Sequence, residues 1–395
     1  MSGSEGMEEE ARSFLGRFAE EFPAALKEGA PLPVSPLSRR VTLEELHGES
    51  LELGRRLLAA RGAPAGLSAL LCQAALSQLL QNDLSPFHCA REPGPNQEEE
   101  QEVVLLESEG VQRVFLNQLI EVTLAWSQDF PKHPPPPSQF LHCSFNQLLG
   151  SQDQCAYYAV FDGHGGVDAA TYAATHLHVA LSKQESLQSD ASSALKMAFK
   201  HTDDMFRGKA KRERLRSGTT GVVVLIQRQQ LSVAWLGDSQ ALLVRGGQAV
   251  TLMDPHKPDR EDEKQRVEDL GGCITFMGCW RVNGTYAVSR AIGDFDQKPY
   301  VSGDADCVTT QLLGDEDYVL LACDGFFDAV EPSEVPHLVR EALRRPDAAG
   351  LRVAQQLVCH AKEAGSSDNI TVMLVFLRPL KQLVGQNSTT GATQQ

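Results

Sequence analysis

The stretch YYAVFDGHGG, residues 157–166, joins an apolar run to an abrupt polar end. The apolar part predicts a buried β-strand over 156–161. An aspartate, a glycine, a histidine and two more glycines follow it, from Asp162 to Gly166. Because glycines leave the backbone with little steric cover, the sequence presents the Asp162 carboxylate and the His164 imidazole at a strand end that a ligand can approach.

Beyond this strand, the sequence contains further β-rich runs at 221–226, 231–236, 241–244, 318–323 and 370–376, and helical patterns at 168–181, 192–207, 260–270, 333–344 and 351–364. Several of these strands are joined by short turns, such as 227–230 and 246–247. Short turns join antiparallel strands, whereas parallel strands need long crossovers. The sequence therefore predicts an α+β fold, in which two antiparallel sheets pack as a β-sandwich flanked by helices.

The residues before this region have a helical pattern. Phe14, Phe18 and Phe22 recur every fourth residue, and Thr42 to Glu45 has the form of a capping box. Such stripes are typical of ordinary helix packing, and a partner-binding surface is the alternative. The predicted domains are a helical N-terminal regulatory or partner-binding region over 1–126 with an acidic linker at 91–102, a proline-rich atypical segment over 127–143, the sandwich domain over 144–380 and a disordered tail over 381–395.

The composition of the 395 residues limits the function classes. The formal net charge of −16 at pH 7 argues against general nucleic-acid binding. Nine cysteines, an odd number without a C-x-x-C pair, indicate reduced thiols rather than disulfides or a zinc site. The N-terminus lacks a secretory pattern, and no apolar stretch reaches membrane-spanning length. We therefore expect no nucleic acid and no membrane as partners, and a cytoplasmic, or also nuclear, location.

Aspartates recur at the ends of the predicted strands, at Asp162, Asp238, Asp324, Asp328 and Asp368. A single such aspartate is most often a turn or cap residue. Several at one sheet rim would repel one another, and a hard divalent cation with oxygen ligands is the natural compensation. Two ions sharing a carboxylate would hold and acidify a water for attack on phosphorus. His164 would then protonate the leaving alkoxide, and a surface or turn histidine is the alternative.

Seven segments carry a family resemblance in order across 145–378: FDGHGG, SGTTG, GDSQA, the stretch from PHKP to RVEDLGG, RVNGTYAVSRAIGD, CDGFFD and SDNITV. This series resembles the PP2C-type metal-dependent serine/threonine protein phosphatases. Within them it is most similar to the phosphatases of calcium/calmodulin-dependent protein kinases, a PIX-binding group with a helical, acidic N-terminal extension. The resemblance implies phosphorylated proteins as substrates, calmodulin-dependent protein kinases among them, and a PIX-like signalling partner for the N-terminal helices.

The resemblance also implies a site for two Mg²⁺ or Mn²⁺ ions at one end of the sandwich. It assigns His164 as the general acid and Asp162 as the catalytic carboxylate that bridges both ions. The carbonyl of Gly163 would bind the outer ion. The other implied metal ligands are Asp324 and Asp368 at the inner ion, and Asp238 and Asp328, together with Asp324, at a weaker third ion. Asn369, Arg290 and Asp294 are implied to support these groups rather than to take part in the chemistry.

One half of the family pattern is missing. In the family, an arginine that binds the substrate phosphate and a Glu-Asp pair precede FDGHGG. Here residues 127–152 contain no arginine, and no carboxylate lies between Asp129 and Asp153. The outer ion should therefore bind more weakly. Two explanations remain open: a catalytically impaired phosphatase that serves as a scaffold, or a segment 127–143 that comes from a variant or misassembled transcript.

A basic cluster precedes SGTTG in this otherwise acidic chain, at Lys209, Lys211, Arg212, Arg214 and Arg216. It is either a solvated helix face or a groove that steers acidic, phosphorylated segments toward the site.

Overall fold

The computed structural model describes residues 3–89, 103–129, 155–345 and 350–384. The chain divides into two compact units, 1–154 and 155–395, and each is described by itself. The predicted linker at 91–102, residues 130–143 of the proline-rich segment and residues 385–395 of the predicted tail lie outside the described residues. Within the described ranges, no helix combines the length and the apolar character that crossing a membrane requires.

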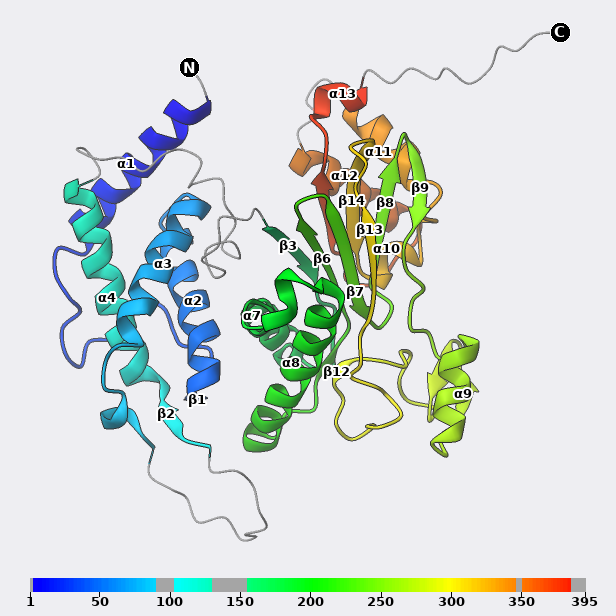
Figure 1. The fold of residues 1–395 in the computed structure, drawn as a ribbon, viewed down its shortest axis with the longest axis horizontal. Coiled ribbons are helices and arrows are strands. Elements are labelled where there is room, and N and C mark those ends of the chain that lie inside the picture. Colours follow the sequence, from blue (N-terminus) through cyan, green and yellow to red (C-terminus); the bar gives the residue numbers. More distant parts are fainter. Residues whose placement is uncertain (1–2, 90–102, 130–154, 346–349, 385–395) are drawn as a thin grey trace. The chain divides into compact units, whose positions relative to one another are not determined.

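The first unit is largely helical over its described residues (Figure 1). Its long helices are α1 (Gly3–Glu21), α2 (Leu43–Ala59), α3 (Ala65–Leu79) and α4 (Ser108–Asp129), with a one-turn 3-10 helix η1 (Ser85–Phe87) and an antiparallel pair β1 (Arg40–Thr42) and β2 (Leu105–Glu107). The expected capping box forms, because the Thr42 hydroxyl accepts from the Glu45 amide at 3.1 Å and the Glu45 carboxylate accepts from the Thr42 amide at 2.8 Å.

The apolar stripe of α1 faces the core of this unit. Phe14 and Phe18 are buried with ring centroids 5.6 Å apart, and Phe22 follows 4.9 Å from Phe18. Leu57, Leu71 and Phe115 bring α2, α3 and α4 into the same cluster. The stripes therefore serve as helix packing, which is the more common use of such a pattern.

The second unit is a sandwich of two four-stranded antiparallel sheets, so the predicted α+β fold class is confirmed. The first sheet has the order β13-β7-β6-β3, and the second the order β15-β14-β8-β9. The strands are β3 (Cys155–Val160), β6 (Gly221–Gln227), β7 (Gln230–Leu236), β8 (Gln240–Arg245), β9 (Gln248–Thr251), β13 (Asp306–Gln311), β14 (Glu316–Ala322) and β15 (Val372–Phe376). Val222, Val233, Leu243 and Val319 are fully buried or nearly so between the sheets.

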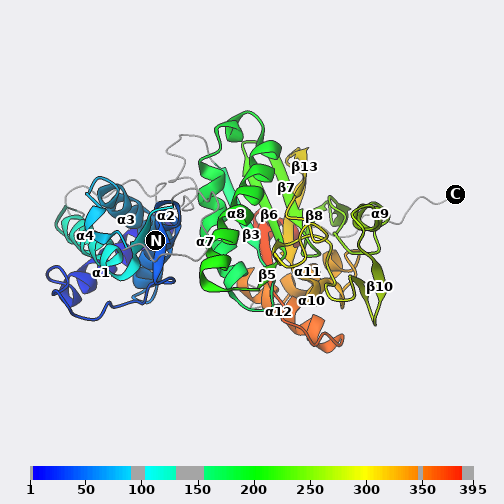
Figure 2. The same ribbon diagram turned by 90° about the horizontal axis from the view of Figure 1, so that it is seen from below.

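Helices cover both outer faces of the sandwich. On the first sheet lie α7 (Asp168–Ser182) and α8 (Ala191–Glu213), which run side by side in Figure 2. On the second lie α11 (Val335–Leu343) and α12 (Gly350–Glu363), whose Val339 and Leu357 pack against Leu320. The remaining elements are η2 (Glu185–Gln188), α9 (Glu261–Asp269), α10 (Asp324–Phe327), α13 (Leu380–Val384) and the hairpin of β10 (Ile274–Phe276) and β11 (Trp280–Val282).

A third, small sheet includes part of the opening stretch, at Gly163 and His164. Its order is β12-β5-β4, with β12 at Ile292–Gly293, β5 at Gly218–Thr219 and β4 at Gly163–His164. Gly163 pairs with Thr219, and His164 pairs with Gly218. This sheet brings three distant segments of the chain together, and the sequence did not predict it.

Candidate active site

The strand ends of both sheets bring the predicted aspartates to one rim of the sandwich. Asp162 follows β3, Asp238 lies in the turn from β7 to β8, Asp324 begins α10 directly after β14, and Asp368 precedes β15. The register fixes this arrangement, because Ala322 at the end of β14 pairs with Gln240 at the start of β8 and with Val372 at the start of β15.

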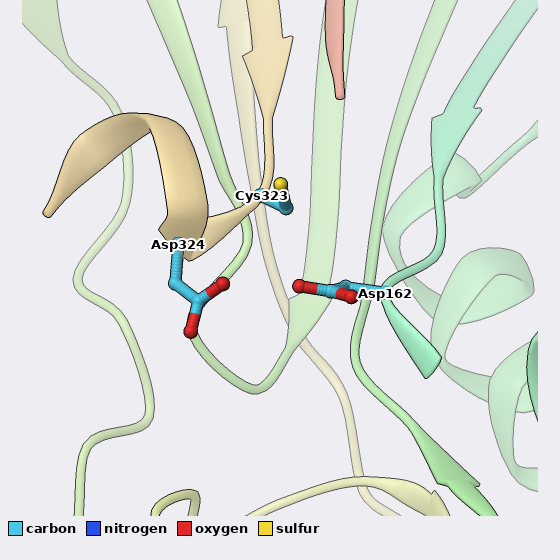
Figure 3. Close-up of side chains that lie close together, drawn as sticks. All are labelled: Asp162, Cys323 and Asp324. Atoms are coloured by element: carbon cyan, nitrogen blue, oxygen red, sulfur yellow. The ribbon is translucent and has the colours of Figure 1, made fainter. Parts of the chain in front are cut away.

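The Asp162 and Asp324 carboxylates point into a shared space (Figure 3). One oxygen of each carboxylate and the Cys323 sulfur all lie within 4.8 Å of one another. Burial, followed by the proximity of Asp324 and the charge of Asp368, raises the pKa of Asp162 to about 7. Burial and the charge of Asp324 likewise raise the pKa of Asp238 to about 7. These carboxylates lack adequate positive partners within the described chain.

The donor set fits a hard divalent cation. Oδ1 of Asp324 is buried and has no hydrogen-bond partner among the described residues, which is costly unless a ligand satisfies it. Carboxylate oxygens are the ligands that Mg²⁺ and Mn²⁺ prefer. The Cys323 thiol is a different case, because it donates to the Asn369 carbonyl and accepts from the Thr371 amide, both at 3.2 Å. Burial raises the pKa of Cys323, which keeps the thiol protonated and unsuited to bind a metal. The sequence motifs did not indicate this neighbour of the two aspartates.

Asp368 and Asp328 are placed differently from this pair. Asp368 is exposed, and its Oδ1 accepts from the Asn369 amide at 2.6 Å. Asp328 forms an ion pair with Lys257, whose Nζ lies 3.2 Å from Asp328 Oδ1. Burial acts to lower the pKa of Lys257, but Asp328, Asp238 and Asp324 together raise it. A cation of the chain itself therefore lies beside the acids predicted to hold a third ion, a contact that the sequence motifs do not predict.

His164 lies at the same rim with one ring nitrogen occupied. Its Nε2 is 2.7 Å from Oδ2 of Asp294, and the Tyr286 ring meets it edge-on with centroids 6.0 Å apart. Burial acts to lower the pKa of His164, but the hydrogen bond and the charge of Asp294 raise it overall. A histidine held in this way can deliver a proton to a group bound at the rim.

A charge network supports the turn that carries Asp238. Nδ1 of His256 accepts from the Gly237 amide at 3.2 Å, and its Nε2 lies 3.0 Å from Asp306. Arg290 bridges Asp306 at 3.1 Å and Glu263 at 2.7 Å. Arg290 thus contacts acids behind the rim, consistent with the supporting role that the motif implies.

Half-buried and buried carboxylates without sufficient partners, beside a histidine held by an acid, are typical of the site of a metal-dependent hydrolase. The chain belongs to the Protein phosphatase 2C family, whose model matches residues 137–370, and the resemblance expected from the ordered motifs is confirmed. At the level of this family, it is a metal-dependent protein-serine/threonine phosphatase.

Named relatives match nearly the whole chain. It is 48% identical over 415 residues to Protein phosphatase 1F of Homo sapiens, covering 98% of this chain and 91% of that protein. It is 46% identical over 385 residues to Protein phosphatase 1E of Homo sapiens, covering 92% of this chain and 50% of that protein. A solved structure of a C. elegans sex determining protein shares the fold, with a TM-score of 0.71 and 21% identity over 94% of this chain and 96% of that one.

The alignment with Protein phosphatase 1F extends over 415 positions, more than the 395 residues of this chain. The relative therefore contains positions that this chain lacks.

Proposed function

We propose that this chain hydrolyses phosphoserine and phosphothreonine in proteins, with signalling kinases, including calmodulin-dependent protein kinases, as substrates. The observation that carries the proposal is the pair Asp162 and Asp324, whose carboxylates each place an oxygen within 4.8 Å of the other. In addition, Oδ1 of Asp324 is buried and has no hydrogen-bond partner among the described residues. That arrangement suits Mg²⁺ or Mn²⁺, which when bound would acidify water and offset the charge of the phosphoryl oxygens.

The residues of the chain have separate tasks in this proposal. Asp162 and Asp324 hold the cations, with Asp368 and the Gly163 carbonyl as further ligands, while Asp238 lies nearby as an acid of the weaker third site. His164 donates a proton to the leaving serine or threonine oxygen, because it lies at the rim and its pKa is raised. No cysteine nucleophile is needed, since the Cys323 thiol is engaged by backbone groups.

The alternative is a catalytically impaired scaffold. Residues 127–152 contain no arginine to clamp the substrate phosphate, and no carboxylate lies between Asp129 and Asp153. An arginine pairs with phosphate through two parallel hydrogen bonds, so its loss weakens substrate binding. In that case the first unit, with its helical core, would remain as the binding region for a PIX-like partner in the cytoplasm or nucleus.

The test is hydrolysis of a phosphothreonine peptide in Mn²⁺, with Asp324→Asn as the comparison. We expect release of phosphate that stops with a chelator and in Asp324→Asn. Activity that survives chelation contradicts the metal mechanism. Absence of turnover, with the fold and Mn²⁺ binding intact, favours the impaired scaffold instead.

A further inference from the structure

Asp294, for which the family motif implies only general support of the site, makes a specific contact with His164. Its side chain is 1% exposed, one oxygen lies 2.7 Å from Nε2 of His164, and the other, Oδ1, is buried without a hydrogen-bond partner among the described residues. A buried carboxylate with a single partner is costly. Its place at the histidine therefore needs a reason beyond packing.

The backbone is bent in order to aim this carboxylate. Gly293 has a φ of +86° and Asp294 a φ of +50°, so two consecutive residues adopt left-handed conformations, which are unfavourable for a residue with a side chain. The turn is held because the Gly293 amide donates to Asp203 at 2.8 Å, and Lys298 pairs with the same carboxylate at 3.1 Å. Backbone strain of this kind concentrates at functional sites.

Two neighbours complete the arrangement. A Cβ at Gly218 would overlap the Asp294 carboxyl group, so a glycine at this position is what lets the carboxylate reach His164. On the other side, the Tyr286 ring meets the imidazole edge-on at 6.0 Å. The ring of His164 is thereby held between an acid and an aromatic side chain, which fixes its plane.

We propose that Asp294 is the positioning residue of His164, and that by occupying Nε2 it makes Nδ1 the atom that donates the proton to the leaving oxygen. The inference rests on the proposed function. As the bond from phosphorus to the serine or threonine oxygen breaks, the Nδ1–H bond breaks and the proton joins that oxygen. The ring is left neutral, with its remaining proton on Nε2 facing Asp294.

The leaving group provides the test of this role. A serine or threonine alkoxide needs a proton in order to depart, whereas p-nitrophenolate does not. We expect Asp294→Asn to lower kcat on a phosphothreonine peptide by about ten- to a hundredfold, within the range attributed to general acid catalysis, and to change kcat on p-nitrophenyl phosphate by less than about threefold. Asparagine is chosen because it tolerates a positive φ. Asp204→Asn, an exposed position on α8, is the matched control and should leave both rates unchanged.

A double variant separates this role from general damage. In His164→Gln, adding Asp294→Asn should cost no further activity, since both changes remove the same step. Equal losses on the two substrates, or additive losses in the double variant, would overturn the proposal.

A measurement without turnover keeps the inference independent of the proposed function. If the wild-type protein hydrolyses neither substrate, the proposed function is contradicted. The contact between Asp294 and His164 can still be measured by ¹⁵N NMR of the histidine rings in the full chain. We expect the neutral His164 ring to carry its proton on Nε2 and to lose that preference in Asp294→Asn, with the signal assigned by its loss in His164→Gln. An unchanged tautomer in Asp294→Asn overturns the proposal, and a melting temperature close to that of the wild type verifies that the variant folds.

Discussion

Two groups of acids in the second unit have opposite electrostatic surroundings. At the rim, burial and neighbouring carboxylates raise the pKa of Asp162 and of Asp238 to about 7. On α9, burial acts in the same direction on Glu263, but hydrogen bonds from Arg290, Arg266 and Ser289 lower its pKa to about 2. Both groups consist of carboxylates in a folded interior, and only their partners differ.

The difference shows which acids serve the fold and which await a ligand. Glu263 is 1% exposed and pairs with Arg266 at 2.9 Å and with Arg290 at 2.7 Å, so the chain itself compensates its charge. Asp162 and Asp324 have no comparable arginine among the described residues. Perturbed acids without internal partners are candidates for function, whereas acids with such partners are structural.

The largest expected effect is on catalysis at the rim. Asp162→Asn should lower kcat on a phosphothreonine peptide by about a thousandfold or more, because a ligand that would hold both cations is lost. The same variant should not lower the melting temperature of the metal-free protein, since it removes a repulsive charge. Kinetics and thermal melting of the same preparation check both statements. A destabilised metal-free variant would show that Asp162 is a structural acid like Glu263.

The opposite result is expected for the buried acid on α9. Glu263→Gln should lower the free energy of unfolding at pH 7 by about 2–3 kcal/mol, because two arginines lose a buried partner. The folded-state pKa of Glu263 is depressed to about 2 from a model value of 4.5, so its stabilisation is present above about pH 4.5 and is lost as the pH falls through about 2. Urea unfolding of the wild type and of Glu263→Gln at pH 7 and pH 3 measures this stabilisation. A difference in unfolding free energy between the two proteins that does not shrink at pH 3 contradicts the pairing of Glu263 with the arginines.

The smallest effect concerns the basic cluster near the rim. Arg216 is exposed and lies next to the loop of Gly165, since a Cβ on that glycine would be 3.6 Å from the Arg216 carbonyl. Arg216→Gln should raise KM for an acidic phosphopeptide by about threefold and leave kcat unchanged, as expected of a screened surface charge. Arg344→Gln, exposed after α11, is the matched control. Equal KM values for Arg216→Gln and the wild type would contradict a substrate-steering role and favour the alternative, a solvated surface cluster.

The sequence predicts the rim better than it predicts its supports. Asp162 and Asp324 are recognisable because an apolar strand ends at each of them and a glycine follows. Strand β13 was missed, since its DCVTTQ sequence is polar and its side chains are half-buried or exposed. The partners of His164 and of Asp328 were missed for a different reason. Asp294 lies 130 residues from His164, and Lys257 lies 71 residues from Asp328, so only tertiary structure brings them together.

Calorimetric titration with Mn²⁺ tests the contrast between the two acid groups most directly. We expect the wild type and Glu263→Gln to bind Mn²⁺ with release of protons, because the raised pKa of Asp162 must fall when a cation binds. Asp324→Asn should give little or no heat of binding. Absence of binding in the wild type, or binding that persists unchanged in Asp324→Asn, would contradict a metal centre at this rim.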